Sequence, residues 1–232
     1  MEQIGFLGNY DNKDLLLNIG KVLSNLGHRV LIVDATYIQR FKYIVPKVSD
    51  KNIMTYISEY QGMDVALGFM NLAGIAQYLG TNQLPYDFAL IQSDNIQTMS
   101  SFGMHMFKNL FFVTSYDQYE IQKTIEMFSL INQPIQLKEI VITADISSSQ
   151  SKYLQNLVSQ TKIKIEKEII ISDNNTDRMV TLQNQLLKEV ILRHYTSNYK
   201  ENLEYIIALM TDGIIQQNDI KRTIKKMWKT KA

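Results

Sequence analysis

The chain has 232 residues and no cysteine, which excludes disulfide bonds and metal sites with cysteine ligands. It contains no run of about 18 apolar residues, so no membrane-spanning helix is expected. The N-terminus leads directly into an apolar strand with Glu2 near its start, unlike a secretory signal, and we expect a cytoplasmic protein. We expect no metal site, because the three histidines lie far apart in the sequence: His28, His105 and His194.

Short apolar runs alternate with helical patterns over most of the chain. Bounded by turn residues, the runs read as buried strands at 4–7, 30–33, 65–69, 88–91, 110–114, 139–143 and 168–171. Helical spacing predicts helices at 13–26, 70–79, 117–131 and 152–161. This alternation predicts an α/β domain over residues 1–192, with a doubly wound, mostly parallel sheet and helices on both faces.

The segment between the first predicted strand and helix stands where a phosphate-binding loop would lie. Such a loop uses glycines for a tight turn, amide N–H groups and a lysine for charge, and a Ser or Thr for magnesium. A carboxylate about 4 Å from a phosphate charge costs roughly 4 kcal/mol at an effective dielectric of about 20. Asp11 and Asp14 would both impose this cost, and Tyr10 adds bulk. The segment reads Gly8, Asn9, Tyr10, Asp11, Asn12, Lys13 and Asp14.

The same segment keeps one phosphate-compatible side chain, Lys13. Asn12 is expected to replace a glycine by adopting a left-handed conformation. Asp14 is expected to satisfy the free N–H groups and the dipole of the first helical turn itself. The chain would then fill its own anion site. The alternative is an ordinary helix N-terminus without any phosphate-binding ancestry.

The order of these elements resembles the ParA/MinD family of deviant phosphate-loop ATPases over roughly residues 1–190. The blocks LGHRVLIVDA (26–35) and LPYDFALIQSD (84–94) are similar to the family's second strand and Walker B strand, and 109–120 and 138–145 resemble later strands. The family's signature lysine and paired glycines correspond to Gly8, Asn9 and Tyr10. Asp34 ends the second strand, but Thr36 replaces the next acid of the family.

Two further positions depart from the family pattern. Gln92 replaces the magnesium-linked aspartate of the Walker B strand, and Thr143 or Ala144 stands where the family has an adenine-contacting asparagine. The resemblance therefore implies a catalytically inactive pseudo-ATPase without a cofactor. It is similar in type to the atypical TadZ/CpaE-like proteins of pilus and secretion assembly.

This resemblance implies a scaffold or localisation factor for a larger bacterial assembly of the pilus, secretion or conjugation type. Its partners would be other proteins of that machine, and the chain would either form a homodimer without nucleotide or not dimerise at all. The alternative is a weak nucleotide-binding ATPase of partition type that uses Lys13 and backbone amides, or a non-specific binder of DNA or membrane surfaces.

The carboxyl ends of the predicted strands form a polar rim at 9–13, 36–40, 92–95 and 115–118, without a nucleophile–base set. Residues 36–50 follow one of these strands and mix aromatic and basic side chains. They are expected either to form an exposed partner surface or to fold back over the sheet. Residues 147–152 are expected to form a polar loop and helix cap.

The last forty residues (193–232) are predicted to form a C-terminal helical hairpin. Helical spacing covers 198–210 and 219–229, with Gly213 as a C-terminal cap and Asn218 as the next N-cap. Residues 219–232 carry six basic residues and one acid, a net charge of +5, whereas the whole chain carries +1. The final helix is predicted to be amphipathic, with the residues Ile220, Lys221, Arg222, Ile224, Lys225, Lys226, Met227, Trp228 and Lys229, followed by Lys231.

Three interpretations of this last helix remain open. Its apolar stripe packs on the preceding helix, or it lies on the inner face of an anionic membrane as a peripheral contact, or its cations meet an acidic partner or nucleic acid. The family resemblance implies the membrane contact, since MinD has a terminal helix of this kind. Nucleic acid is the least expected partner, because no recognition helix or aromatic base platform is present.

Overall fold

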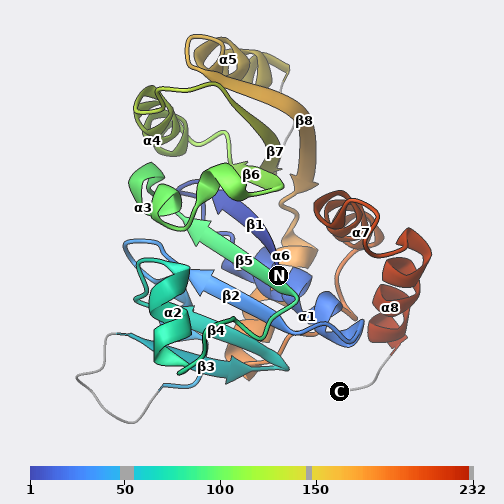
Figure 1. Ribbon diagram of the computed structural model, residues 1–232. Coiled ribbons are helices and arrows are strands. Elements are labelled where there is room, and N and C mark those ends of the chain that lie inside the picture. The colour runs from blue at the N-terminus through green and yellow to red at the C-terminus, as the bar shows by residue number, and fades with distance from the viewer. Residues whose placement is uncertain (48–54, 145–147, 230–232) are drawn as a thin grey trace.

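The computed structural model describes residues 1–47, 55–144 and 148–229 (Figure 1). Several residues discussed above lie outside these ranges: 48–50 of the 36–50 segment, Ser147, and 230–232 of the basic tail, which include Lys231.

An eight-stranded sheet in the order β3-β4-β2-β5-β1-β6-β7-β8 forms the centre of the molecule (Figure 1). All neighbouring strands are parallel except the edge pair β3–β4, which is antiparallel. The prediction of a doubly wound, mostly parallel sheet is confirmed. The strands are β1 (Glu2–Leu7), β2 (Val30–Asp34), β3 (Tyr56–Tyr60), β4 (Met63–Leu67), β5 (Phe88–Ser93), β6 (Asn109–Thr114), β7 (Ile135–Thr143) and β8 (Ile163–Ser172).

Helices cover both faces of this sheet, and each face has its own hydrophobic core. One core contains side chains of α1 (Lys13–Asn25), α6 (Asn175–Leu187), α7 (Ser197–Thr211) and α8 (Gln217–Lys229). The other contains side chains of α2 (Leu72–Tyr78), α3 (Ile96–Ser101), α4 (Gln118–Ser129) and α5 (Ser148–Val158). In Figure 1, α2 and α3 lie in front of the sheet and α1 and α6 lie behind it.

The central strands form where the sequence has apolar runs without alternation, because both of their faces are covered by helices. All residues of β2, β5 and β6 are buried. The sequence-based prediction missed β3, which alternates between buried and more exposed positions at the sheet edge. It also missed α3 and α6. In α6 the apolar residues are mostly exposed and only Val180 is buried, so the apolar pattern does not mark the side that faces the core.

The C-terminal hairpin forms as predicted, with a different cap. Asp212 ends α7 in the left-handed conformation and Gly213 follows with φ 81°. The backbone N–H of Asp219 bonds the carbonyl of Gln216, and α8 begins at Gln217. The prediction of Asn218 as the N-cap is therefore wrong, since this residue already lies inside the helix.

Candidate functional site

The loop at 8–12 leaves the end of β1 between the neighbouring strands β5 and β6. The N–H of Gly8 donates to the carbonyl of Ser93, 3.1 Å away. Gly8 has φ 146°, and a Cβ atom at this position would lie 2.1 Å from the carbonyl oxygen of Val113. The loop thus passes so close to the β6 backbone that a side chain is excluded.

Lys13 opens α1, and its charge is taken up by two carboxylates. Its Nζ lies 2.6 Å from Asp11 Oδ2 and 3.4 Å from Asp14 Oδ2. Arg40 approaches the same cluster, with a guanidinium nitrogen 3.7 Å from Asp11 Oδ1. The sequence-predicted residues Asp11, Lys13 and Asp14 therefore come together, joined by a cation from a distant loop.

Asp14 is held by side chains. Its Oδ2 accepts a hydrogen bond of 2.8 Å from Gln185 Nε2 of α6, in addition to the contact with Lys13. Burial raises the pKa of the Asp14 carboxyl, although Lys13 and Gln185 oppose this shift. The expected bonds to the first-turn amides are replaced by these side-chain contacts.

Asn12 precedes α1 with φ −104° and ψ 13°, so the predicted left-handed conformation is wrong. Glycine is not needed here, because the backbone turns earlier, at Gly8. The Asn12 side chain is buried, and its Oδ1 has no hydrogen-bond partner within the described residues.

A cavity of about 340 Å³ opens beside this loop, between α1, α6 and the ends of β7 and β8. Burial and the nearby Asp173 and Asp11 raise the pKa of the Tyr10 hydroxyl to about 12. Asp177 bonds the N–H and Oγ1 of Thr196, each at 2.7 Å. The charged lining residues are four acids and two bases: Asp11, Asp14, Asp173, Asp177, Lys13 and Arg178.

Asp34, at the end of β2, is fully buried and holds the following loop. Its Oδ1 accepts bonds from the N–H of Thr36 at 3.1 Å and from Thr36 Oγ1 at 2.5 Å. Its Oδ2 accepts the N–H of Phe41 at 3.1 Å. Burial raises the pKa of this carboxyl, against these three hydrogen bonds. Both carboxylate oxygens of Asp34 therefore accept hydrogen bonds from the loop that follows β2.

The loop after β2 folds back over the sheet within residues 36–47 and also exposes aromatic rings, while the partner surface stays a prediction. Phe41, Ile44 and Val45 are buried and fold back over the sheet. Tyr37 is 95% exposed, and Tyr43 of the short helix Arg40–Tyr43 is also exposed. The inward side chains anchor the loop and leave aromatic rings at the surface.

No family model matches this sequence, and no curated protein is similar to it. Solved structures do match. A ParA family ATPase from Chlorobium tepidum is 15% identical to this chain, with a TM-score of 0.62. The alignment covers 90% of this chain and 98% of the ATPase chain. McdA of Cyanothece, in its complex with ATP, is 12% identical with a TM-score of 0.55. The alignment covers 93% of this chain and 99% of the McdA chain. The matching chain of the MinC:MinD complex from Aquifex aeolicus is 15% identical with a TM-score of 0.53. The alignment covers 100% of this chain and 97% of that chain.

This is the fold of the ParA/MinD ATPases. The predicted phosphate-loop α/β fold is thereby confirmed, and the 8–14 segment stands at the first strand–helix turn of that fold. The TadZ/CpaE-like subtype stays a prediction.

The residues at this turn of the ParA/MinD fold do not fit a magnesium nucleotide. Lys13 is engaged by Asp11 and Asp14, and the cavity beside it has twice as many acids as bases. Gln92, in register with Asp34, is buried, and its Oε1 has no hydrogen-bond partner in the parts of the chain described. Across the described ranges, no cluster of three or more His, Asp or Glu residues could hold a metal ion.

The C-terminal hairpin packs its apolar stripe inward. Ile220 and Ile224 are buried with residues of α7 and α1, and Met227 is partly buried against the same core. Lys200 Nζ lies 3.5 Å from the centre of the Trp228 ring, a cation–π contact at the end of α8. Five cations of this helix face outward: Lys221, Arg222, Lys225, Lys226 and Lys229.

Sequence reasoning missed one titratable site. Glu139, in the middle of β7, is 2% exposed, and its Oε1 has no hydrogen-bond partner among the described residues. Burial and the neighbouring Glu168 raise its pKa to about 7. The sequence signal that could have revealed this site is a single acid at the start of the run EIVI within a predicted buried strand, since charged residues are rarely buried without a partner.

None of the helices in the described ranges has the length and apolar content needed to cross a membrane.

Proposed function

We propose that this chain is a pseudo-ATPase that does not bind ATP and acts as a scaffold through protein contacts. The observation that carries the proposal is the position of Lys13 between Asp11 and Asp14. A triphosphate would have to separate Lys13 from two carboxylates and would then lie beside these carboxylates. Each such pair costs roughly 4 kcal/mol at 4 Å and an effective dielectric of about 20.

The scaffold role is supported by the contacts that the acidic residues of this site make with other parts of the chain. Asp14 ties α1 to α6 through Gln185, Asp11 lies near Arg40, and Asp34 holds the loop after β2. The side chains at this site thus bind one another and connect α1, α6 and the loop after β2. A site filled by its own side chains suits a positioning role in a larger bacterial assembly of the pilus, secretion or conjugation type. MinD in complex with MinC is a precedent for protein partners on this fold.

The proposal predicts no stabilisation by ATP and magnesium in a thermal unfolding titration. A ligand present at about a hundred times its dissociation constant stabilises a protein by about 2.7 kcal/mol. For a domain of this size that would raise Tm by roughly 5–10 °C. We expect a shift below about 1 °C at millimolar ATP, with Lys13→Ala behaving like the wild type. A large shift that is lost in Lys13→Ala would establish the rival, a weak partition-type ATPase, and refute the proposal.

A second candidate function is peripheral binding to an anionic membrane surface. It is favoured by the outward cations of α8, while the buried Ile220 and Ile224 argue against insertion of its apolar stripe. Binding would then be electrostatic, worth about 1 kcal/mol for each cation near the surface. Nucleic acid would offer phosphates to the same cations, but the described surface presents no feature that reads bases.

Flotation with vesicles containing anionic lipid tests this candidate. The variant Lys225→Glu/Lys229→Glu is expected to lower the partition coefficient by about 30-fold or more, because two attractive charges are lost. The control Lys152→Glu/Lys164→Glu has the same net charge and places its changes far from α8. Equal losses in the two variants would show that only net charge matters and would exclude a binding role of α8.

A further inference from the structure

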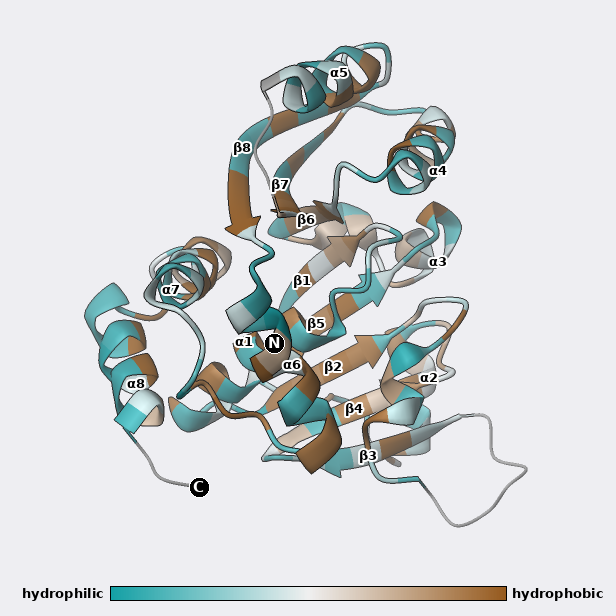
Figure 2. Cartoon of the chain, turned by 180° about the vertical axis from the view of Figure 1, so that it is seen from behind, coloured by the Kyte–Doolittle hydropathy of each residue, from teal (hydrophilic) through white to brown (hydrophobic). Residues whose placement is uncertain are grey.

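Helix α6 carries apolar residues on the side that faces solvent. Met179 is 65% exposed, Leu182 53% and Leu186 82%. The buried side chains of α6, namely Asp177, Val180 and Asn184, lie on the opposite side of the helix at 100° per residue. Figure 2 shows α6 toward the viewer with brown, hydrophobic residues in its last turn.

The outward face of α6 also lacks the charges that normally keep a surface helix in water. The whole helix has two charged residues, and one of them, Asp177, is buried. On α6 itself the neighbours of the stripe are Asn175, Gln183 and Gln185 together with the single cation Arg178. At one edge, Leu182 also borders the charged cavity beside Lys13. Depletion of charge around large apolar side chains is the composition of an interface centre.

The spacing of the stripe is that of one seam of a helix pair. Met179, Leu182 and Leu186 are separated by three and four residues, the spacing by which one helix packs along another. We infer that α6 is a self-association surface, on which the α6 helix of a second copy of this chain packs antiparallel about a two-fold axis near Leu182. Such an interface is isologous, because the same stripe serves both copies.

Two features favour a second copy as the occupant. Antiparallel pairing places the N-terminal end of each helix, with Arg178, beside the C-terminal end of the other, where the helix dipole is negative. Two-fold symmetry also brings three large apolar side chains from each copy into one contact. This area is small compared with the roughly 800 Å² per partner of a standard interface. We therefore expect weak, concentration-dependent dimerisation.

The inference goes beyond the proposed function and does not rest on it, since it is argued from the exposed apolar side chains of α6 and not from the pairing of Lys13. Leu182 borders the cavity beside Lys13, whereas Met179 and Leu186 do not line it.

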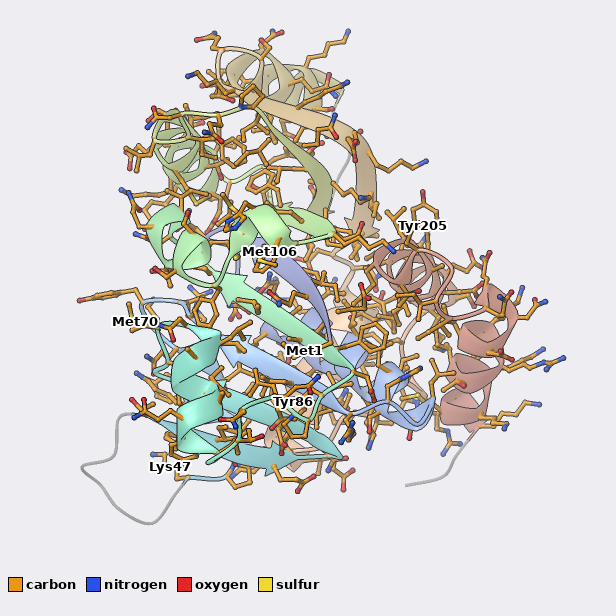
Figure 3. All side chains as sticks on the ribbon, viewed as in Figure 1. Met1, Lys47, Met70, Tyr86, Met106 and Tyr205 are labelled. Carbon is orange, nitrogen blue, oxygen red and sulfur yellow. The ribbon has the colours of Figure 1, made fainter. Side chains whose placement is uncertain are left out.

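Sedimentation equilibrium of the full chain over a range reaching hundreds of micromolar tests the inference. We expect the average mass of the wild type to rise toward that of a dimer. Leu182→Glu should weaken association by about 30-fold or more, since it places two like charges together at the two-fold axis. The control Met106→Glu changes a residue that is 71% exposed and lies on the other side of the molecule, where Figure 3 labels it. A wild type that stays monomeric, or a Leu182→Glu variant that dimerises like the control, would overturn the inference.

Disulfide trapping provides an independent geometric test, because the chain has no native cysteine. A disulfide requires Cβ atoms about 3.5–4.5 Å apart. Two copies of Leu182→Cys would meet at the two-fold axis, so mild oxidation should give a covalent dimer. Met106→Cys should give little. Equal trapping of the two variants would overturn the proposed arrangement, even if the chain dimerises.

Discussion

Glu139→Gln is expected to raise the free energy of unfolding by about 3 kcal/mol at pH 8 and to change it little at pH 4.5. Folding raises the pKa of Glu139 from 4.5 to about 7, through burial and the charge of Glu168. One pKa unit corresponds to about 1.36 kcal/mol. Above the folded pKa, the native protein has to keep an ionised carboxylate in an apolar site. Glutamine removes this cost, and its amide can donate to the carboxylate of Glu168, the cross-strand neighbour on β8.

The sign of the pH dependence follows from linkage. Between pH 4.5 and about 7 the native state binds more protons at Glu139 than the unfolded state does. Wild-type stability should therefore fall as the pH rises through this window, and the loss is complete above pH 7. The variant lacks this slope.

Urea unfolding of both proteins between pH 4.5 and pH 8 measures the effect. Glu201→Gln, a change at an exposed position of α7, serves as the control and should stay within about 0.5 kcal/mol of the wild type. A Glu139→Gln gain that is equal at pH 4.5 and pH 8 would contradict the assignment, because it would come from packing instead of ionisation.

The fold could be predicted from the sequence where burial is complete on both faces. The runs of β2, β5 and β6 have no polar alternation, so their period and order were clear. Prediction failed where tertiary contacts decide. β3 is an edge strand, and α6 exposes four large apolar residues but buries only one, Val180, so no apolar period marks its inner side.

The candidate site was predictable where its members are neighbours in sequence. Asp11, Lys13 and Asp14 lie within four residues, and their mutual contacts follow from that spacing. Gln185 and Arg40 join the same cluster from other elements, and no local pattern marks them. The role of Asp34 was also hidden, since its hydrogen bonds depend on the path of the loop that follows it.

Gly8→Ala is expected to destabilise the protein by about 3–5 kcal/mol. The resemblance to a phosphate loop suggests that this glycine makes room for a ligand, but in the structure it makes room for the protein's own backbone. Its φ of 146° disfavours any side chain, and the new Cβ would meet the carbonyl oxygen of Val113 at 2.1 Å. Backbone strain costs about 1–3 kcal/mol, and the clash adds to it because β1 and β6 are neighbouring strands of the rigid sheet.

Gly80→Ala is the matched control for this prediction. Gly80 also has a positive φ, 63°, but no atom lies within 4 Å of the position of its Cβ. Its substitution should cost only the left-handed backbone strain, about 1–2 kcal/mol. Chemical unfolding of the two variants separates the two causes. If Gly8→Ala proved no less stable than Gly80→Ala, the loop would have room to move away from β6. A glycine kept for a phosphate would then be the better explanation, and the pseudo-ATPase proposal would lose one of its structural supports.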